Sequence, residues 1–301
     1  MVVMLPGGSE RSAPDDLRQL TPHHATRTRF AGRTGPLAAL DTGPGPRGTI
    51  LLVAGFTGSK EDFAPLLDPV AAAGWRVVAI DQRGQFESPG PDDEAAYTVD
   101  QLAADVLAVA TELHGTGPLH LLGHSFGGIV ARAAVLADPG TFASLTLLGS
   151  GPVGLTGPRA DLLDHLAPLL AAGGVPLVHR TLEELALTDP LAAAVPAPVR
   201  EFLARRFLAN DAAGLTGMAA AMTGEPDRVA ELRATGVPVL VAHGVDDDAW
   251  TPAAQEDMAH RLGAQHEVIG GSVHSPAIEQ PVRTVELLTG FWAGVPAGVD
   301  A

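Results

Sequence analysis

The chain of 301 residues contains no cysteine. This absence excludes disulfide bonds, thiolate metal sites and a cysteine nucleophile, but it does not identify the cellular compartment. Basic residues are also scarce, since 19 of them, with Lys60 as the one lysine, stand against 35 acidic residues and give a formal net charge of −16. So negative a chain repels phosphate backbones and anionic membrane surfaces, and we therefore expect no nucleic-acid partner.

Long hydrophobic runs are missing as well. The apolar start at residues 1–5 is too short for a signal peptide, Pro6 breaks it, and no later run approaches membrane-spanning length. We therefore expect a cytoplasmic protein without membrane insertion. Residues 1–24 are rich in proline, glycine, serine and charge, which is typical of a mobile N-terminal leader. A hydrophobic content of 46% excludes general disorder. Residues 25–301 are predicted to form one domain, since no internal repeat or low-complexity linker marks a second one.

Apolar runs alternate with helical patterns over most of this domain. Strands are predicted at residues 26–30, 35–40, 49–54, 76–80, 118–122, 144–148, 238–242 and 266–269. Helices are predicted at residues 63–73, 99–113, 126–137, 252–262 and 281–292. The alternation favours βαβ units and a mainly parallel sheet. It stops at about residues 152–224, where helical pieces such as 159–171, 181–187 and 198–209 predict an inserted helical cap.

Ser125 lies between two glycines at the junction of a predicted strand and a predicted helix. The segment Gly123-His124-Ser125-Phe126-Gly127 has the G-x-S-x-G pattern of a nucleophile elbow. A serine at the tip of so tight a turn needs neighbours without a Cβ atom, because a side chain there would collide across the turn. The pattern and its context predict that Ser125 is a nucleophile.

A serine hydroxyl needs a base to accept its proton and a carboxylate to orient that base. An aspartate run, Asp246-Asp247-Asp248, follows the predicted strand 238–242, and His274 follows the predicted strand 266–269. Open α/β sheets place their sites beyond the carboxyl ends of the strands, so these side chains are expected near Ser125. The order along the chain is serine, aspartate, histidine.

With these residues the sequence resembles the α/β-hydrolase superfamily, and within it the small serine esterases and lipase-like enzymes. The resemblance covers most of residues 26–151 and 225–295. It implies an α/β-hydrolase fold: a mainly parallel eight-stranded sheet with helices on both faces and a helical cap. It also implies that Ser125 is the nucleophile, His274 the general base and Asp247 the orienting acid, with Asp248 as the alternative acid.

The same resemblance assigns an oxyanion hole to two main-chain N–H groups, those of Phe126 and Phe56. Phe56 belongs to the loop after the predicted strand 49–54, where Ala54 replaces the histidine usual in the family. Phe86 replaces a glycine in a segment that resembles a structural motif of the family. It is expected to belong to the scaffold, and the alternative is that it lines the acyl pocket.

Taken together, these features predict a serine hydrolase that cleaves a carboxylic ester or lactone through an acyl-enzyme. Because a leucine-rich cap would overhang Ser125, the small-molecule substrate is expected to be largely apolar. An acyl thioesterase, with a carrier protein as partner, and a C–C bond hydrolase are the alternatives, and a non-catalytic ligand-binding protein is the alternative from another class. Serine rather than aspartate at position 125 argues against an epoxide hydrolase. No cofactor or metal is expected, and the sequence does not indicate an oligomeric state.

Overall fold

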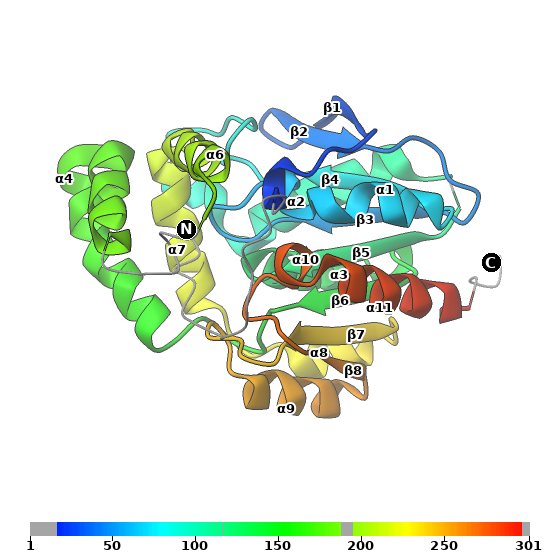
Figure 1. Ribbon diagram of the computed structural model, residues 1–301. Helices are drawn as coiled ribbons and strands as arrows, with labels where there is room; N and C mark the ends of the chain where they lie inside the picture. The colour runs from blue at the N-terminus through cyan, green and yellow to red at the C-terminus, as the bar shows by residue number, and fades with distance from the viewer. Residues whose placement is uncertain (1–16, 116, 188–194, 297–301) are drawn as a thin grey trace.

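The computed structural model describes residues 17–115, 117–187 and 195–296, and its centre is one eight-stranded sheet (Figure 1). The strand order across the sheet is β1-β2-β4-β3-β5-β6-β7-β8. The strands are β1 (Thr26–Ala31), β2 (Pro36–Asp41), β3 (Thr49–Val53), β4 (Arg76–Ile80), β5 (Leu119–His124), β6 (Ser144–Leu148), β7 (Val239–Gly244) and β8 (Gln265–Ile269). Strand β2 pairs antiparallel with β1 and β4, and all other pairs are parallel. The prediction of a mainly parallel eight-stranded sheet is confirmed.

Helices cover both faces of the sheet, because successive residues of each central strand point to opposite sides. They are α1 (Ala64–Ala72), α2 (Val99–Leu113), α3 (Phe126–Ala137), α9 (Pro252–Leu262), α10 (Pro276–Glu279) and α11 (Pro281–Gly294), with the short 3-10 helices η2 (Lys60–Phe63), η3 (Glu94–Tyr97) and η4 (Pro139–Thr141). Leu51 and Val53 of β3 pack with α2 and α3, whereas Ile50 and Leu52 pack with α1 and α11.

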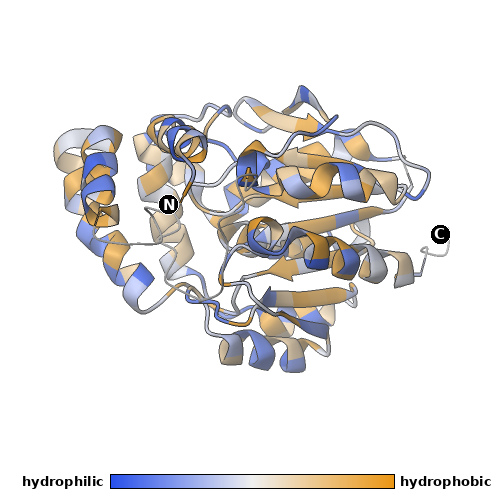
Figure 2. Ribbon diagram, in the orientation of Figure 1, coloured by the Kyte–Doolittle hydropathy of each residue, from blue (hydrophilic) through white to orange (hydrophobic). Residues whose placement is uncertain are grey.

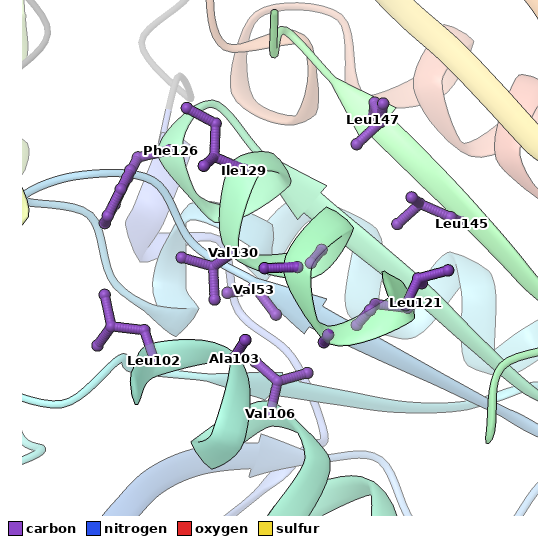
Figure 3. Close-up of a cluster of buried hydrophobic side chains, with 14 of the residues drawn as sticks. Val53, Leu102, Ala103, Val106, Leu121, Phe126, Ile129, Val130, Leu145 and Leu147 are labelled. Carbon is purple, nitrogen blue, oxygen red and sulfur yellow. The ribbon is translucent and has the colours of Figure 1, made fainter. Parts of the chain in front are cut away.

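Figure 3 shows the first of these two layers, in which Val53 and Leu121 of the sheet face Leu102, Val106 and Val130 of the helices. Hydropathy follows the same division. The strands are mostly apolar, whereas the outer helices carry polar residues on their free sides (Figure 2). The loops at the carboxyl ends of the strands therefore rest on a core that is buried from both sides.

Between β6 and β7 the chain forms a block of helices. These are α4 (Pro158–Ala186), α6 (Ala197–Leu208), α7 (Ala212–Gly224) and α8 (Val229–Ala234), and the described residues between the two strands contain no strand. We call α4, α6 and α7 the cap. The sequence predicted separate helices at residues 159–171 and 181–187. Two helical legs are indeed present within α4, because the backbone of Gly174 (φ 66°, ψ −169°) is not helical and interrupts the helix, but the legs extend further than predicted and meet at this glycine.

Helix α4 is also the one helix in the described part of the chain whose length and apolar composition would allow it to cross a membrane. A single such helix is weak grounds for a membrane span. The bend at Gly174 divides its 29 residues into two legs, each shorter than the roughly 20 residues that a span requires. In Figure 1 the two legs lie side by side at one edge of the molecule, away from the sheet.

The predicted N-terminal leader is only partly described, since residues 1–16 lie outside the described residues. The expectation of a loose leader is wrong for residues 17–24. These residues include the 3-10 helix η1 (Arg18–Leu20), and polar contacts hold them on the domain. Gln19 Nε2 donates a hydrogen bond to Asp62 Oδ1 (2.9 Å), and the main-chain N–H of His24 donates one to Asp68 Oδ1 (2.9 Å).

Candidate active site

Ser125 lies at the tip of the turn that joins β5 to α3. Its backbone has a conformation that residues other than glycine rarely adopt (φ 54°, ψ −124°). The turn is possible because its neighbours are glycines. A Cβ atom added to Gly123 would overlap the carbonyl group of Gly127, and one added to Gly127 would overlap the carbonyl oxygens of Val53 and Ala54. The main-chain N–H of Ser125 donates to the carbonyl of Leu148 (2.9 Å), which fixes the turn against β6.

The structure brings together the three side chains that the sequence singled out. His274 Nε2 lies 2.9 Å from Ser125 Oγ, and His274 Nδ1 lies 2.9 Å from Asp247 Oδ1. All three residues are buried. An ionised carboxylate only accepts hydrogen bonds, so His274 donates through Nδ1, and neutral His274 then accepts the Ser125 hydroxyl proton at Nε2. This is the tautomer that general-base action on Ser125 requires.

Asp247 is held in its ionised form. Burial by itself would raise the pKa of this carboxyl group. The charge and hydrogen bond of His274 outweigh burial, together with hydrogen bonds from the main-chain N–H of Ala249 (3.0 Å) and from Gln255 Nε2 (3.0 Å), so the pKa lies below its ordinary value. The carboxylate therefore remains available to stabilise an imidazolium on His274.

His124, the residue before Ser125, takes a different role from the base. Its Nε2–H group donates to the main-chain carbonyl of His274 (2.7 Å), and the two rings lie 5.1 Å apart. Burial, with a further contribution from the nearby His274, lowers the pKa of His124 to about 4. His124 is therefore neutral at physiological pH and supports the loop that carries His274.

The two predicted oxyanion donors have free main-chain N–H groups. Within the described part of the chain, the hydrogen-bond pattern gives no acceptor to the N–H of Phe126, the first residue of α3, or to that of Phe56. The amino end of a helix also carries a partial positive charge, which favours an anion beside Phe126. This corner of the site is therefore suited to an oxygen that develops negative charge.

Ala54 and Phe86, the two departures from the family pattern, have clear structural surroundings. The side chain of Ala54 packs in the apolar layer beneath α1, and its carbonyl oxygen accepts a hydrogen bond from Gln82 Nε2 (2.8 Å). The ring of Phe86 packs edge to face on Phe202 of α6 (centroids 5.7 Å apart) and lies 4.9 Å from Lys60 Nζ. Phe86 thus contacts the cap as well as the scaffold.

The model of the α/β-hydrolase fold family matches residues 48–281, which is most of the chain. The chain belongs to the α/β-hydrolase family. A solved thermophilic esterase from Thermogutta terrifontis superposes with a TM-score of 0.73 at 25% identity, over 90% of this chain and 99% of that one. The fold and the family that the sequence indicated are confirmed.

Curated relatives of this α/β-hydrolase also carry hydrolase names. A monoacylglycerol lipase from Mycolicibacterium smegmatis is 28% identical over 222 residues, 69% of this chain and 73% of that protein. A candidate carbamate hydrolase from Variovorax paradoxus is 37% identical over 108 residues, 36% of this chain and 40% of that protein. The match therefore spans less than half the length of the second relative.

Asp248, the alternative acid, is directed elsewhere in this hydrolase. It pairs with Arg159 in the first turn of α4, so it contacts the cap. The described residues contain no group of three or more histidine, aspartate or glutamate side chains that could hold a metal ion. The geometry of the site thus rests on Ser125, His274 and Asp247.

Sequence reasoning missed several residues that shape the site. Gln255 supports Asp247 from α9, and Gln85 Nε2 donates to the carbonyl of Gly55 (2.9 Å) in the oxyanion loop. Gln85 precedes Phe86 in the segment that is expected to be scaffold. It is far from Ser125 in the sequence, so no local pattern indicates that it supports the site. Asp62 accepts a hydrogen bond from the main-chain N–H of Ser59, just after the oxyanion loop. It follows Ser59 by three residues, which is the spacing of a capping box, and this spacing is the one sequence signal that indicates it.

Proposed function

We propose that the protein is a serine hydrolase that cleaves a carboxylic ester or lactone through an acyl-enzyme. The observation that carries this proposal is the continuous chain of hydrogen-bond distances from Ser125 Oγ through His274 to Asp247. A buried serine in contact with a correctly oriented histidine is the arrangement that activates a hydroxyl group as a nucleophile. The names of the esterase and lipase relatives agree with this reaction class.

In the proposed reaction, Ser125 Oγ attacks the ester carbonyl carbon while His274 Nε2 accepts the hydroxyl proton. The carbonyl oxygen becomes an oxyanion and accepts hydrogen bonds from the N–H groups of Phe56 and Phe126. His274 then donates its proton to the leaving alkoxide, which departs as an alcohol. Water, deprotonated by His274, attacks the acyl-enzyme and releases the carboxylic acid and free Ser125.

An apolar substrate is favoured by the inner side of the cap. Val175, Val178 and Leu182 of α4 form a buried apolar cluster with Phe207 of α6 and Leu215 of α7. Phe56 packs against this cluster and also against the main core. The oxyanion loop therefore contacts an aliphatic surface, which suits an uncharged hydrocarbon group on the substrate.

Labelling with a fluorophosphonate probe tests the proposal. Folded protein should acquire one phosphonyl group on Ser125, and the Ser125→Ala variant none. Ser275→Ala is the matched control, because it removes a hydroxyl group beside His274 and should label normally. Failure of the folded wild type to label would reject the serine-hydrolase proposal.

Hydrolysis of p-nitrophenyl esters of increasing acyl length, run beside acyl thioesters, then tests the substrate class. A preference for uncharged esters of medium length is expected from the apolar cluster. Faster turnover of thioesters would favour the thioesterase alternative, which would also add a carrier protein as partner. A preference for short charged acids would contradict an apolar pocket.

A further inference from the structure

The oxyanion loop is held in an unfavourable backbone conformation. The main-chain N–H of Gly58 donates to the carbonyl of Gly55 (3.0 Å), which closes a turn with Phe56 and Thr57 at its centre. Thr57 has φ 57°, in the left-handed region, where a β-branched residue is strained. A strained turn persists only where its surroundings fix it on several sides. The position of the Phe56 N–H therefore depends on what holds this turn.

Side chains hold the turn at both of its ends. At the first end, Gln82 and Gln85 donate hydrogen bonds to the carbonyl oxygens of Ala54 and Gly55. At the other end, the main-chain N–H of Ser59 donates to Asp62 Oδ2 (3.1 Å). The glutamine contacts lie within the core domain, whereas the contact at the second end continues into the cap.

Asp62 joins the loop to the cap through its second oxygen. Arg206 of α6 donates from Nη1 to Asp62 Oδ1 (2.6 Å), and the same Nη1 atom lies 3.5 Å from Ser59 Oγ. Burial alone would raise the pKa of the Asp62 carboxyl group, but the charge of Arg206 and the hydrogen bonds from Gln19 and Arg206 hold the pKa below its ordinary value. The ion pair is thus fully charged and largely shielded from water, conditions in which it fixes geometry well.

The same carboxylate also lies close to the turn itself. A Cβ atom added to Gly58 would lie 2.6 Å from Asp62 Oδ2, so the turn and the carboxylate leave no room for a side chain at this position. Arg206 is buried, while its neighbour Arg205 is exposed and lies near the ring of Phe202 on the same helix. Arg205 therefore provides a matched cation that does not contact the loop.

We propose that Arg206 is a positioning residue that acts through Asp62 to hold the Phe56 N–H in place for the oxyanion. Docking of the cap and assembly of the oxyanion hole are then coupled through one ion pair. This inference rests on the proposed function. It goes further by giving the cap a part in the rate of the chemical step, in addition to forming a pocket wall.

The test compares Arg206→Met with Arg205→Met on p-nitrophenyl acetate, a substrate with too short an acyl group to depend on the cap cluster. Loss of one oxyanion donor typically costs about 10²-fold to 10³-fold in kcat. A donor that is displaced but still present should cost roughly tenfold or more, with KM changed by less than about twofold. Arg205→Met should keep wild-type kcat, and Arg206→Lys should recover part of the loss.

A second readout isolates the oxyanion hole. A trifluoromethyl ketone forms an adduct with Ser125 that carries an oxyanion, so its affinity should fall in Arg206→Met by the same factor as kcat. Asp62→Asn should reproduce both effects with little change of shape. It also serves as the second variant if Arg206→Met is poorly folded by circular dichroism.

The outcomes separate the two proposals. Wild-type protein that neither labels nor hydrolyses esters would reject the serine-hydrolase function. An active wild type in which Arg206→Met and Asp62→Asn keep normal kcat and normal affinity for the trifluoromethyl ketone would reject the positioning role alone. A rise confined to KM would also reject it, because it would mean that Arg206 affects only substrate binding.

Discussion

Lys60, the one lysine of the chain, is fully buried beside three carboxylates. Its Nζ atom lies 2.8 Å from Asp81, 2.7 Å from Glu87 and 3.2 Å from Glu61, and Arg27 contacts both glutamates. Two cations thus face three carboxylates. Burial, reinforced by the charge of Glu61 and opposed by Lys60, raises the pKa of Asp81 to about 6. Removing the charge of Lys60 should therefore expose how strongly the fold depends on it.

Lys60→Met keeps most of the side-chain volume and deletes the ammonium group. Asp81 is fully buried, so it would lose its main counter-charge without gaining water. Breaking a buried pair from one side typically costs about 3–5 kcal/mol. For a domain of this size, that loss corresponds to a fall of about 5–8 °C in Tm. Urea and thermal unfolding of the variant and the wild type measure it directly.

The loss should grow with pH. A carboxyl group whose pKa is higher in the folded chain than in the unfolded chain lowers the free energy of unfolding as pH rises between the two values. For wild-type Asp81 that interval runs from 3.8 to about 6. Without Lys60 the folded pKa rises further and the interval extends upward. The difference between variant and wild type should therefore be larger near pH ~7.5 than near pH ~5.

A double variant completes the experiment. Lys60→Met combined with Asp81→Leu replaces both charges by apolar groups and should recover much of the lost stability, because it leaves no uncompensated buried charge. Two results would refute the reasoning: a loss below about 1 kcal/mol in Lys60→Met, or a loss that is equal at both pH values.

Three further predictions concern the elbow, the acid and the buried lysine. Asp247→Asn should lower kcat by about 10⁴-fold. Asp248→Asn only breaks the pair with Arg159 and should keep kcat within a few-fold. Steady-state kinetics compare the two variants, and the opposite ranking would mean that Asp248 is the acid. Gly123→Ala should abolish folding or lower stability by more than about 3 kcal/mol, since its Cβ would overlap the opposite side of the turn; a normal Tm would contradict the elbow geometry. An amine-acylating reagent should leave Lys60 unmodified in native protein and modify it in urea, as mass spectrometry of its peptide would show; rapid native modification would mean that its site opens readily.

The sheet was predictable because its signal is local. Each strand of the core is a short apolar run bounded by glycine, proline or charge. The glycines around Ser125 predict the tight turn from a pattern of only five residues. The position of His274 followed from the same logic, since its predicted strand ends just before it. The choice between Asp247 and Asp248 could not be settled in this way. Neighbouring carboxylates differ only in direction, and the hydrogen bond from the main-chain N–H of Asp247 to the carbonyl of Gly244 helps to set that direction in the folded chain.

Contacts between distant segments were not predictable. The sequence of α4 predicts two helices, and Gly174 does separate two helical legs, but the packing of these legs side by side is not visible in the sequence. Residues 17–24 look like a loose leader by composition, yet Gln19 and His24 find partners in residues 60–70. The partners in these contacts are more than 40 residues apart in the sequence. At such separations the sequence pattern does not show which residues will meet.

The cap illustrates why such contacts matter to function. A long insertion adds little loop-closure cost, so its presence alone does not fix its position over the site. In this hydrolase two ion pairs do so at separate places. Arg159 of α4 pairs with Asp248 beside Asp247, the proposed acid, and Arg206 of α6 pairs with Asp62 behind the loop that carries Phe56, the proposed oxyanion donor. One pair adjoins the loop that carries Asp247, and the other adjoins the loop that carries Phe56. A displacement of the cap would therefore disturb both of these loops together. Substitutions on the apolar inner side of the cap should therefore change substrate preference. Loss of the Arg206–Asp62 pair should instead lower kcat for every substrate, whereas loss of the Arg159–Asp248 pair alone should keep kcat within a few-fold.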